Sequence, residues 1–160
     1  MISDKIWAPW RITYIKNHKK EKGCLFCRVL RSSKDKNNLV IFRSEFSLCM
    51  LNLYPYNNGH IMVAPKRHTS SLENLNEKET TDLMNSVKKA TRLLKKTLKP
   101  QGFNYGINSG RVSGAGIEGH LHVHIVPRWQ GDTNFMPVVF NTKIISQSLS
   151  ALYQALTKAL

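Results

Sequence analysis

Three of the six histidines in this chain of 160 residues lie at alternate positions of one apolar run, GHLHVHIVPRW (119–129). Alternate residues of a β-strand project to the same face about 6.6 Å apart, so His120, His122 and His124 are predicted to form a row. An imidazole can hold a metal ion, attack an electrophile or move a proton. The row is therefore a metal site, a catalytic site or a group of packed core histidines.

A single metal ion cannot account for the whole row. A tetrahedral zinc ion with Zn–N distances of about 2.0 Å reaches two neighbours, whereas the outer pair, His120 and His124, is about 13 Å apart.

Directly before the row, the glycines of SGAG (113–116) allow backbone N–H groups to approach an anion closely. An imidazole beside that loop could attack phosphorus, and its neighbour could protonate the leaving oxygen. The pattern predicts phosphoryl-group chemistry.

The chain is strongly basic, with 24 Lys and Arg residues against 10 Asp and Glu residues and a net charge of +14. This excess fits either a solvated basic surface or the attraction of a polyanion, such as nucleic acid or the phosphates of a nucleotide. Many of the cations fall on the outer face of a predicted amphipathic helix, where a solvated surface is the simpler explanation. We therefore expect no nucleic-acid partner.

The chain has three cysteines, of which Cys24 and Cys27 form a C-x-x-C motif and Cys49 lies in an apolar run. The N-terminus lacks the features of a signal peptide, and no apolar stretch of 18 residues occurs, so we expect a cytoplasmic protein without a membrane span. In that compartment a C-x-x-C motif indicates a metal knuckle or a redox pair. Cys49 is most simply a small buried hydrophobe.

The elements that must position these residues are predicted from hydrophobic periodicity and turn signals. Asn76 is a plausible N-cap of a helix that ends at Lys99, before Pro100, and a short helix starts near Ser146. The predicted strands cover 38–44, 46–53, 60–65, 103–108 and 120–126, the last closed by a proline. Short connections between these elements predict one α+β domain built on a mainly antiparallel five-stranded sheet.

Several segments together resemble the histidine triad (HIT) family. HLHVHIV (120–126) matches the signature His-φ-His-φ-His-φ-φ, and NLYPYNNGHIMVAPKRH (52–68) resembles the family's earlier strand–turn–strand block. IWAPWRITYI, SGAGIEGHLHVHIVPRW and GDTNFMPV (131–138) resemble the bacterial diadenosine tetraphosphate phosphorylase or hydrolase branch. The resemblance implies one HIT domain over 1–160, with an N-terminal arm (1–23), a core (24–139) and a C-terminal tail or helix (140–160). It also implies a homodimer whose two sheets join.

The resemblance further implies nucleotidyl transfer from a dinucleoside polyphosphate through a covalent intermediate on His122. His124 matches the residue at the bridging oxygen, His60 matches a supporting histidine, and Asn52 matches the position that binds the ribose. The other nucleotide-binding positions line the base pocket or face the phosphates: Phe26, Val29, Met50, Leu53, Asn108, Ser113, Gly114, Ala115 and Gly116. Gly116 stands where many members carry Gln or Ser, so one phosphate donor is missing. Trp129 either stacks on a base or packs under the sheet.

Family members with an N-terminal C-x-x-C hold zinc, and the matching set here is Cys24, Cys27, His68 and His120. Such a closed Cys₂His₂ site is structural. Two other functions stay open beside nucleotidyl transfer: a nucleoside phosphoramidase and a non-catalytic nucleotide- or RNA-binding module. A hydrolase that binds catalytic zinc with the whole triad is disfavoured by the strand geometry.

Overall fold

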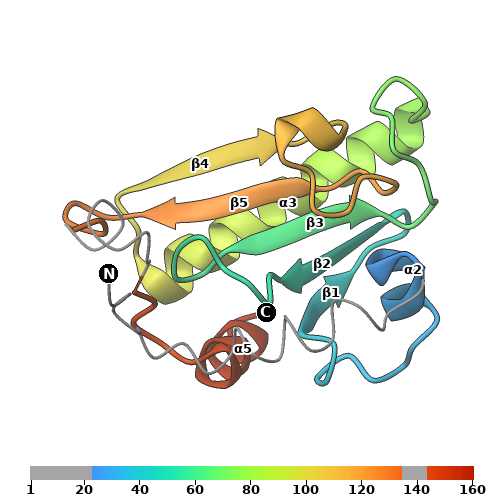
Figure 1. Ribbon diagram of the computed structural model, residues 1–160. Coiled ribbons are helices and arrows are strands. Elements are labelled where there is room, and N and C mark those ends of the chain that lie inside the picture. Colours follow the sequence, from blue (N-terminus) through green and yellow to red (C-terminus); the bar gives the residue numbers. More distant parts are fainter. Residues whose placement is uncertain (1–22, 135–143) are drawn as a thin grey trace, which may run out of the picture.

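The computed structural model describes residues 23–134 and 144–160, and an antiparallel five-stranded sheet of order β1-β2-β3-β5-β4 forms its centre (Figure 1). The strands are β1 (Val40–Arg43), β2 (Ser47–Leu51), β3 (Ile61–Pro65), β4 (Gly102–Ile107) and β5 (Val123–Arg128). The helices are α2 (Leu25–Leu30), α3 (Glu77–Leu98) and α5 (Leu149–Lys158). The α+β class, the antiparallel sheet, the long helix and the C-terminal helix are confirmed. The predicted arm up to residue 22 and the end of GDTNFMPV lie outside the described residues.

The two faces of the sheet are covered by different helices. One face packs on α3, which crosses β2, β3 and β5, and on α5 (Figure 1). The other face packs on α2 through a second apolar cluster, which consists of Phe26, Val29, Val40, Leu48, Met50, Met62 and Ala64. We call this set the α2 cluster. Because β2 and β3 are covered on both faces, every one of their residues is buried.

The long helix α3 begins as its sequence predicts. The side chain of Asn76 accepts a hydrogen bond from the backbone N–H of Glu79 (2.9 Å), and the Glu79 carboxylate accepts one from the backbone N–H of Asn76 (3.0 Å). This capping box satisfies two N–H groups that lack a partner within the helix. At the other end, Lys99 is left-handed with φ 49°, and Pro100 cannot continue the helix.

The predicted strand over 120–126 is wrong at both ends, because β5 runs from Val123 to Arg128 and contains Pro127. The Arg128 carbonyl accepts a hydrogen bond from the Gln101 N–H on the β4 side. Because the backbone groups of successive strand residues point to opposite sides, the backbone N and C=O of Pro127 point away from β4. There its carbonyl accepts a hydrogen bond from the Asn57 side chain (3.0 Å). The missing N–H of proline therefore breaks no ladder hydrogen bond.

The last helix, α5, starts later than predicted, and the short helix α2 was not predicted. Ser148 caps α5 by accepting a hydrogen bond from Ala151 N (3.2 Å), so the helix begins at Leu149 rather than near Ser146. Helix α2 has six residues and no side-chain cap. It is too short for periodicity to reveal it. No helix within the described residues is long and apolar enough to cross a membrane.

Candidate active site and metal centre

The three triad histidines lie in a row in the structure, although only His124 lies inside β5. The imidazole rings of His122 and His124 have centroids 4.7 Å apart, and the Phe26 ring lies 5.0 Å from His120 and 5.1 Å from His122. His60 joins the row from β3's N-terminal side, with its ring 5.0 Å from His124. Each of these four histidine residues is at most 8% exposed, so their protonation states are set by protein groups rather than by water.

The hydrogen bond of His122 fixes which of its nitrogens is reactive. Its Nδ1 lies 2.8 Å from the His120 carbonyl, which can only accept, so Nδ1 carries the proton. In the neutral ring, Nε2 then holds the lone pair. Burial lowers the pKa of His122, and the hydrogen bond to the His120 carbonyl offsets part of this shift. The ring is therefore neutral at neutral pH, as a nucleophile requires.

A chain of hydrogen bonds fixes the opposite tautomer for His124. The Tyr56 backbone N–H donates to His60 Nδ1 (3.0 Å), so His60 carries its proton on Nε2. That N–H donates to His124 Nδ1 (2.8 Å), which leaves the His124 proton on Nε2. Burial first, and the neighbouring histidines second, lower the pKa of His60 to about 3 and that of His124 to about 4. His124 is thus a neutral hydrogen-bond donor beside the neutral His122 ring, whose Nε2 holds a lone pair.

His60 is held by the turn that precedes it. Gly59 has φ 79°, and a Cβ atom there would lie 2.6 Å from Leu98 Cδ1, so this position requires glycine. Asn52 pairs with His60 across the turn, because its backbone N–H donates to the His60 carbonyl (2.9 Å). The Asn52 side-chain amide lies 3.3 Å from His60 Nδ1. The structure thus brings Asn52 and His60 together with the histidine row.

The predicted base-pocket residues are only partly brought together. Phe26, Val29 and Met50 meet in the α2 cluster and are at most 4% exposed. Leu53 lies apart from them and is 50% exposed. Trp129 follows the end of β5, about 17 Å along the strand from His124, and lines a surface cavity with Asn57, Asn58 and Asp132, among others. The structure therefore does not place Trp129 with the α2 cluster.

The glycine loop and β4 border the same face of the sheet. Gly106 pairs with His124, and a Cβ atom on Gly106 would meet nothing within 4 Å, so the space over Gly106, next to His124, is open. Asn108 follows on the same face by alternation and is half-buried. In the loop, the Ser113 hydroxyl donates to the Gly110 carbonyl (2.6 Å), Gly114 has φ 87° and Ala115 is buried, whereas Gly116 is exposed.

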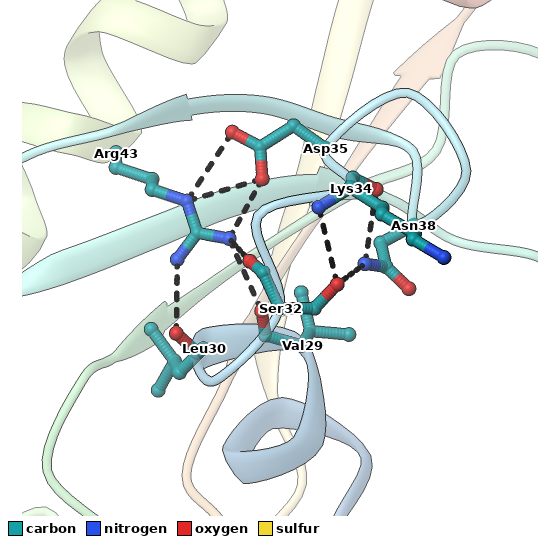
Figure 2. Close-up of polar contacts among 7 residues, drawn as sticks. All are labelled: Val29, Leu30, Ser32, Lys34, Asp35, Asn38 and Arg43. Carbon is teal, nitrogen blue, oxygen red and sulfur yellow. Dashed lines mark hydrogen bonds and ion pairs between the residues drawn. The ribbon is translucent and has the colours of Figure 1, made fainter.

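Helix α2 is anchored by Arg43, which sequence reasoning missed (Figure 2). The Arg43 Nη2 donates to the carbonyls of Val29 (3.1 Å) and Ser32 (3.0 Å) and lies 2.7 Å from an Asp35 carboxylate oxygen. A cation at a helix C-terminus satisfies carbonyls that have no partner within the helix and opposes the helix dipole. Because α2 carries Phe26, this anchor also supports the rings of His120 and His122.

Four side chains from three segments form a cluster suited to a metal ion: Cys24, Cys27, His68 and His120, whose ligand atoms all lie within 4.8 Å of one another. The two Nδ1 atoms are 3.3 Å apart, and three S···N distances measure 3.2, 3.3 and 3.7 Å. A zinc tetrahedron with bonds of about 2.0 Å to N and 2.3 Å to S requires about 3.3 Å between nitrogens and 3.5 Å between N and S. The donor set and its spacing fit zinc.

The tautomer of His120 is also set for metal binding. Its Nε2 lies 2.8 Å from the Pro65 carbonyl and must donate to it, so Nδ1 presents its lone pair to the cluster. Burial lowers the pKa of His120, which favours the neutral ring that a metal needs. The three triad histidines therefore differ in the nitrogen they present or in its protonation: a lone pair on Nδ1 of His120, a lone pair on Nε2 of His122, and an N–H on Nε2 of His124.

A buried triad of histidines beside a Cys₂His₂ set, on an antiparallel α+β sheet, defines a histidine-triad site. The chain belongs to the HIT family, because the model of the HIT domain matches residues 33–131. It is 39% identical over 153 residues to the AP-4-A phosphorylase of Mycobacterium tuberculosis, a match that covers 91% of this chain and 78% of the relative.

Two Schizosaccharomyces pombe proteins are also similar. One is the asymmetrical bis(5'-nucleosyl)-tetraphosphatase, 34% identical over 64% of this chain and 56% of the relative. The other is the adenosine 5'-monophosphoramidase hnt1, 30% identical over 66% of this chain and 74% of the relative. The family and relatives named as a phosphorylase and hydrolases support an enzyme that processes nucleotides.

Solved structures agree with the fold. A hypothetical histidine triad nucleotide-binding protein from Sulfolobus tokodaii has a TM-score of 0.67 and 27% identity, and the match covers 85% of this chain and 91% of that one. A Zn-bound histidine triad family protein from Mycobacterium smegmatis has a TM-score of 0.67 at 23% identity, covering 86% and 92% of the two chains. Both share the α+β architecture described above.

Proposed function

We propose that this enzyme cleaves dinucleoside polyphosphates, such as diadenosine tetraphosphate, at an α-phosphate through a covalent nucleotidyl intermediate on His122. The observation that carries the proposal is the pair of opposite tautomers. The lone pair of His122 Nε2 and the Nε2–H of His124 belong to rings 4.7 Å apart, where a phosphorus atom and its bridging oxygen could meet them. The relatives named above act on such nucleotides by name, which supports the same substrate class.

In the first step, His122 Nε2 forms a bond to the α-phosphorus, and the bond from phosphorus to the bridging oxygen breaks with its electron pair on oxygen. Positive charge that develops on the His122 ring is stabilised by its Nδ1–H bond to the His120 carbonyl. His124 donates its Nε2–H to the departing oxygen. Because a polyphosphate is a weak base, this hydrogen bond suffices and no proton need be transferred.

In the second step, water or inorganic phosphate attacks the same phosphorus and breaks the N–P bond, which returns the lone pair to His122. Attack by water releases a nucleoside monophosphate and one proton to solvent, and attack by phosphate releases a nucleoside diphosphate. We assign the base to Phe26, Val29 and Met50, which meet in the α2 cluster, and the ribose to Asn52, whose side-chain amide lies beside His60. The Ser113–Gly116 backbone and Asn108 border the phosphates, and we assign no base contact to Trp129.

Zinc at Cys24, Cys27, His68 and His120 would be structural, because four protein ligands close the tetrahedron. When bound, it supplies a cross-link that ties α2 to the sheet, and no step above is routed through it. Its thiolate ligands suit the reducing cytoplasm expected from the sequence.

The proposed homodimer would join at β4. This strand pairs only with β5 within the described chain, so its outer edge offers unpaired N–H and C=O groups. Its side chains Tyr105 and Ile107 are 51% and 39% exposed. Edge-to-edge pairing of two copies would cover both and continue the sheet.

The test is incubation with diadenosine tetraphosphate, with and without inorganic phosphate, followed by chromatography. ADP that appears only with phosphate identifies a phosphorylase, and AMP with ATP, formed without phosphate, identifies a hydrolase. His122→Ala should lose all turnover while keeping its circular dichroism spectrum and its zinc content, whereas His18→Ala, outside every proposed set, should remain active. An active His122→Ala enzyme, or a wild type inert toward every dinucleotide, would refute the proposal.

A nucleoside phosphoramidase is the second candidate, favoured by the similarity to hnt1. Its amine leaving group is a strong base and must gain a proton during bond cleavage. With its pKa lowered to about 4, His124 is rarely charged at neutral pH and donates that proton poorly. We therefore expect adenosine phosphoramidate to be cleaved more slowly than the tetraphosphate, and the reverse order would favour the phosphoramidase.

A further inference from the structure

Tyr56 is the aromatic residue at the open end of the histidine row. Its ring lies 4.5 Å from the His60 ring and stacks on the His124 ring at 5.6 Å with an interplanar angle of 29°. The two histidines beneath it are at most 8% exposed, whereas Tyr56 is 55% exposed. The tyrosine side chain thus covers the His60–His124 hydrogen bond and presents its outer edge to solvent.

The order of the aromatic rings indicates the direction in which a bound substrate would run through the site. Phe26 of α2 lies beside His122, His122 beside His124, and His124 beside Tyr56, with centroids 5.1, 4.7 and 5.6 Å apart. In a phosphoryl-transfer reaction the leaving group departs on the side of phosphorus opposite the nucleophile. With the base at the α2 cluster and His122 as nucleophile, the leaving chain passes His124 and continues to Tyr56.

From this order we infer that Tyr56 recognises the leaving group, with its hydroxyl donating a hydrogen bond to a non-bridging oxygen of the polyphosphate. The inference rests on the proposed function and extends it to the half of the substrate that His122 does not retain. Because Tyr56 is the ring next after His124, it meets the phosphates that follow the bridging oxygen rather than the distant second base. A phenol suits this position, since its ring packs on imidazoles while its O–H faces a charged acceptor.

The backbone and side chain of Tyr56 have separate tasks, which makes the inference testable. The backbone N–H sets the His60 tautomer and is present in every variant except proline. Tyr56→Phe keeps that N–H and the ring stacking but removes the hydroxyl. Tyr153→Phe is the matched control, because Tyr153 belongs to α5 and packs against the cluster on the opposite face of the sheet.

The experiment compares two substrates that deliver the same adenylyl group to His122. One is diadenosine tetraphosphate, and the other is the p-nitrophenyl ester of AMP, whose leaving group has no phosphate. Tyr56→Phe is expected to lower kcat/KM for the tetraphosphate about tenfold or more, the contribution of one hydrogen bond to a charged acceptor, and to leave the ester rate unchanged. Tyr153→Phe should match the wild type on both substrates.

An equal loss on both substrates, or no loss on either, would overturn the inference, because the hydroxyl would then not distinguish leaving groups. Failure of the proposed function gives a different result. A wild-type enzyme that cleaves neither substrate refutes nucleotidyl transfer itself, and one that cleaves the ester alone refutes polyphosphate recognition at Tyr56 while leaving His122 as the nucleophile.

Discussion

Acidification from pH 7.5 to pH 5 should destabilise the fold through the His60–His124 pair. In the folded protein, burial lowers the pKa of His60 to about 3 and that of His124 to about 4, from 6.5 in an unperturbed histidine. Between about pH 4 and 6.5 the unfolded chain therefore binds protons that the folded chain does not. Stability is complete above pH 6.5 and is lost as the pH falls below that value.

The size of the loss depends little on the folded pKa values, because both lie well below pH 5. Each histidine that is neutral when folded and charged when unfolded lowers the free energy of unfolding by about 1.36 kcal/mol per pH unit. From pH 7.5 to pH 5 this gives about 2 kcal/mol for each histidine and about 4 kcal/mol for the pair. That loss is a large fraction of the stability of an ordinary domain.

Urea denaturation of the wild type and of His60→Gln at several pH values between 5 and 7.5 measures this effect. Glutamine keeps an N–H donor toward His124 Nδ1 but does not titrate. Between pH 5 and 6 the slope of unfolding free energy against pH should fall by about 1.2 kcal/mol per unit in the variant. The carboxyl of Glu79, whose pKa its ion pair with Arg67 lowers to about 2, titrates below this window. Coincident slopes would show that His60 is not held neutral by burial.

Three further predictions concern the supports of the site. Cys24→Ser removes one ligand of the Cys₂His₂ set, so zinc measured by plasma mass spectrometry should fall below one per chain; full retention would exclude this ligand set. Arg43→Met removes the side-chain donor to the Val29 and Ser32 carbonyls, and should lower the free energy of unfolding by about 1–3 kcal/mol in urea denaturation and raise KM more than it lowers kcat. Arg43→Lys should restore KM in part, and an unchanged KM in both variants would separate this anchor from substrate binding. Ile107→Lys adds a charge to the exposed edge of β4 and should give monomers in light scattering, whereas a dimer that persists would place the interface elsewhere.

The parts of the fold that follow from local rules were predictable from the sequence. The cap at Asn76 and the stripe of apolar residues after it define α3, because both signals act within one or two turns of chain. Helix α2 was not predictable, since its six residues are held by two long-range contacts. Phe26 packs in the α2 cluster against the sheet, and Arg43 of β1 donates to the carbonyls at the helix end. Pro127 was wrongly predicted to end its strand for a similar reason. A proline ends a strand only where its position needs a ladder N–H, and the direction in which the backbone groups at that position point is a property of the assembled sheet.

Within the site, the sequence predicts that the three histidines lie in a row but not which nitrogen of each ring carries the proton. Alternation along GHLHVHIV places three imidazoles on one face, but the chemistry of each depends on the nitrogen that carries its proton. That choice is made by acceptors and donors elsewhere in the chain: the Pro65 carbonyl for His120, the His120 carbonyl for His122, and His60 for His124. Two of these partners are 55 and 64 residues away, so only the folded sheet distinguishes the three rings. A substitution that preserves the triad but moves β3 relative to β5 would therefore abolish activity with every histidine in place.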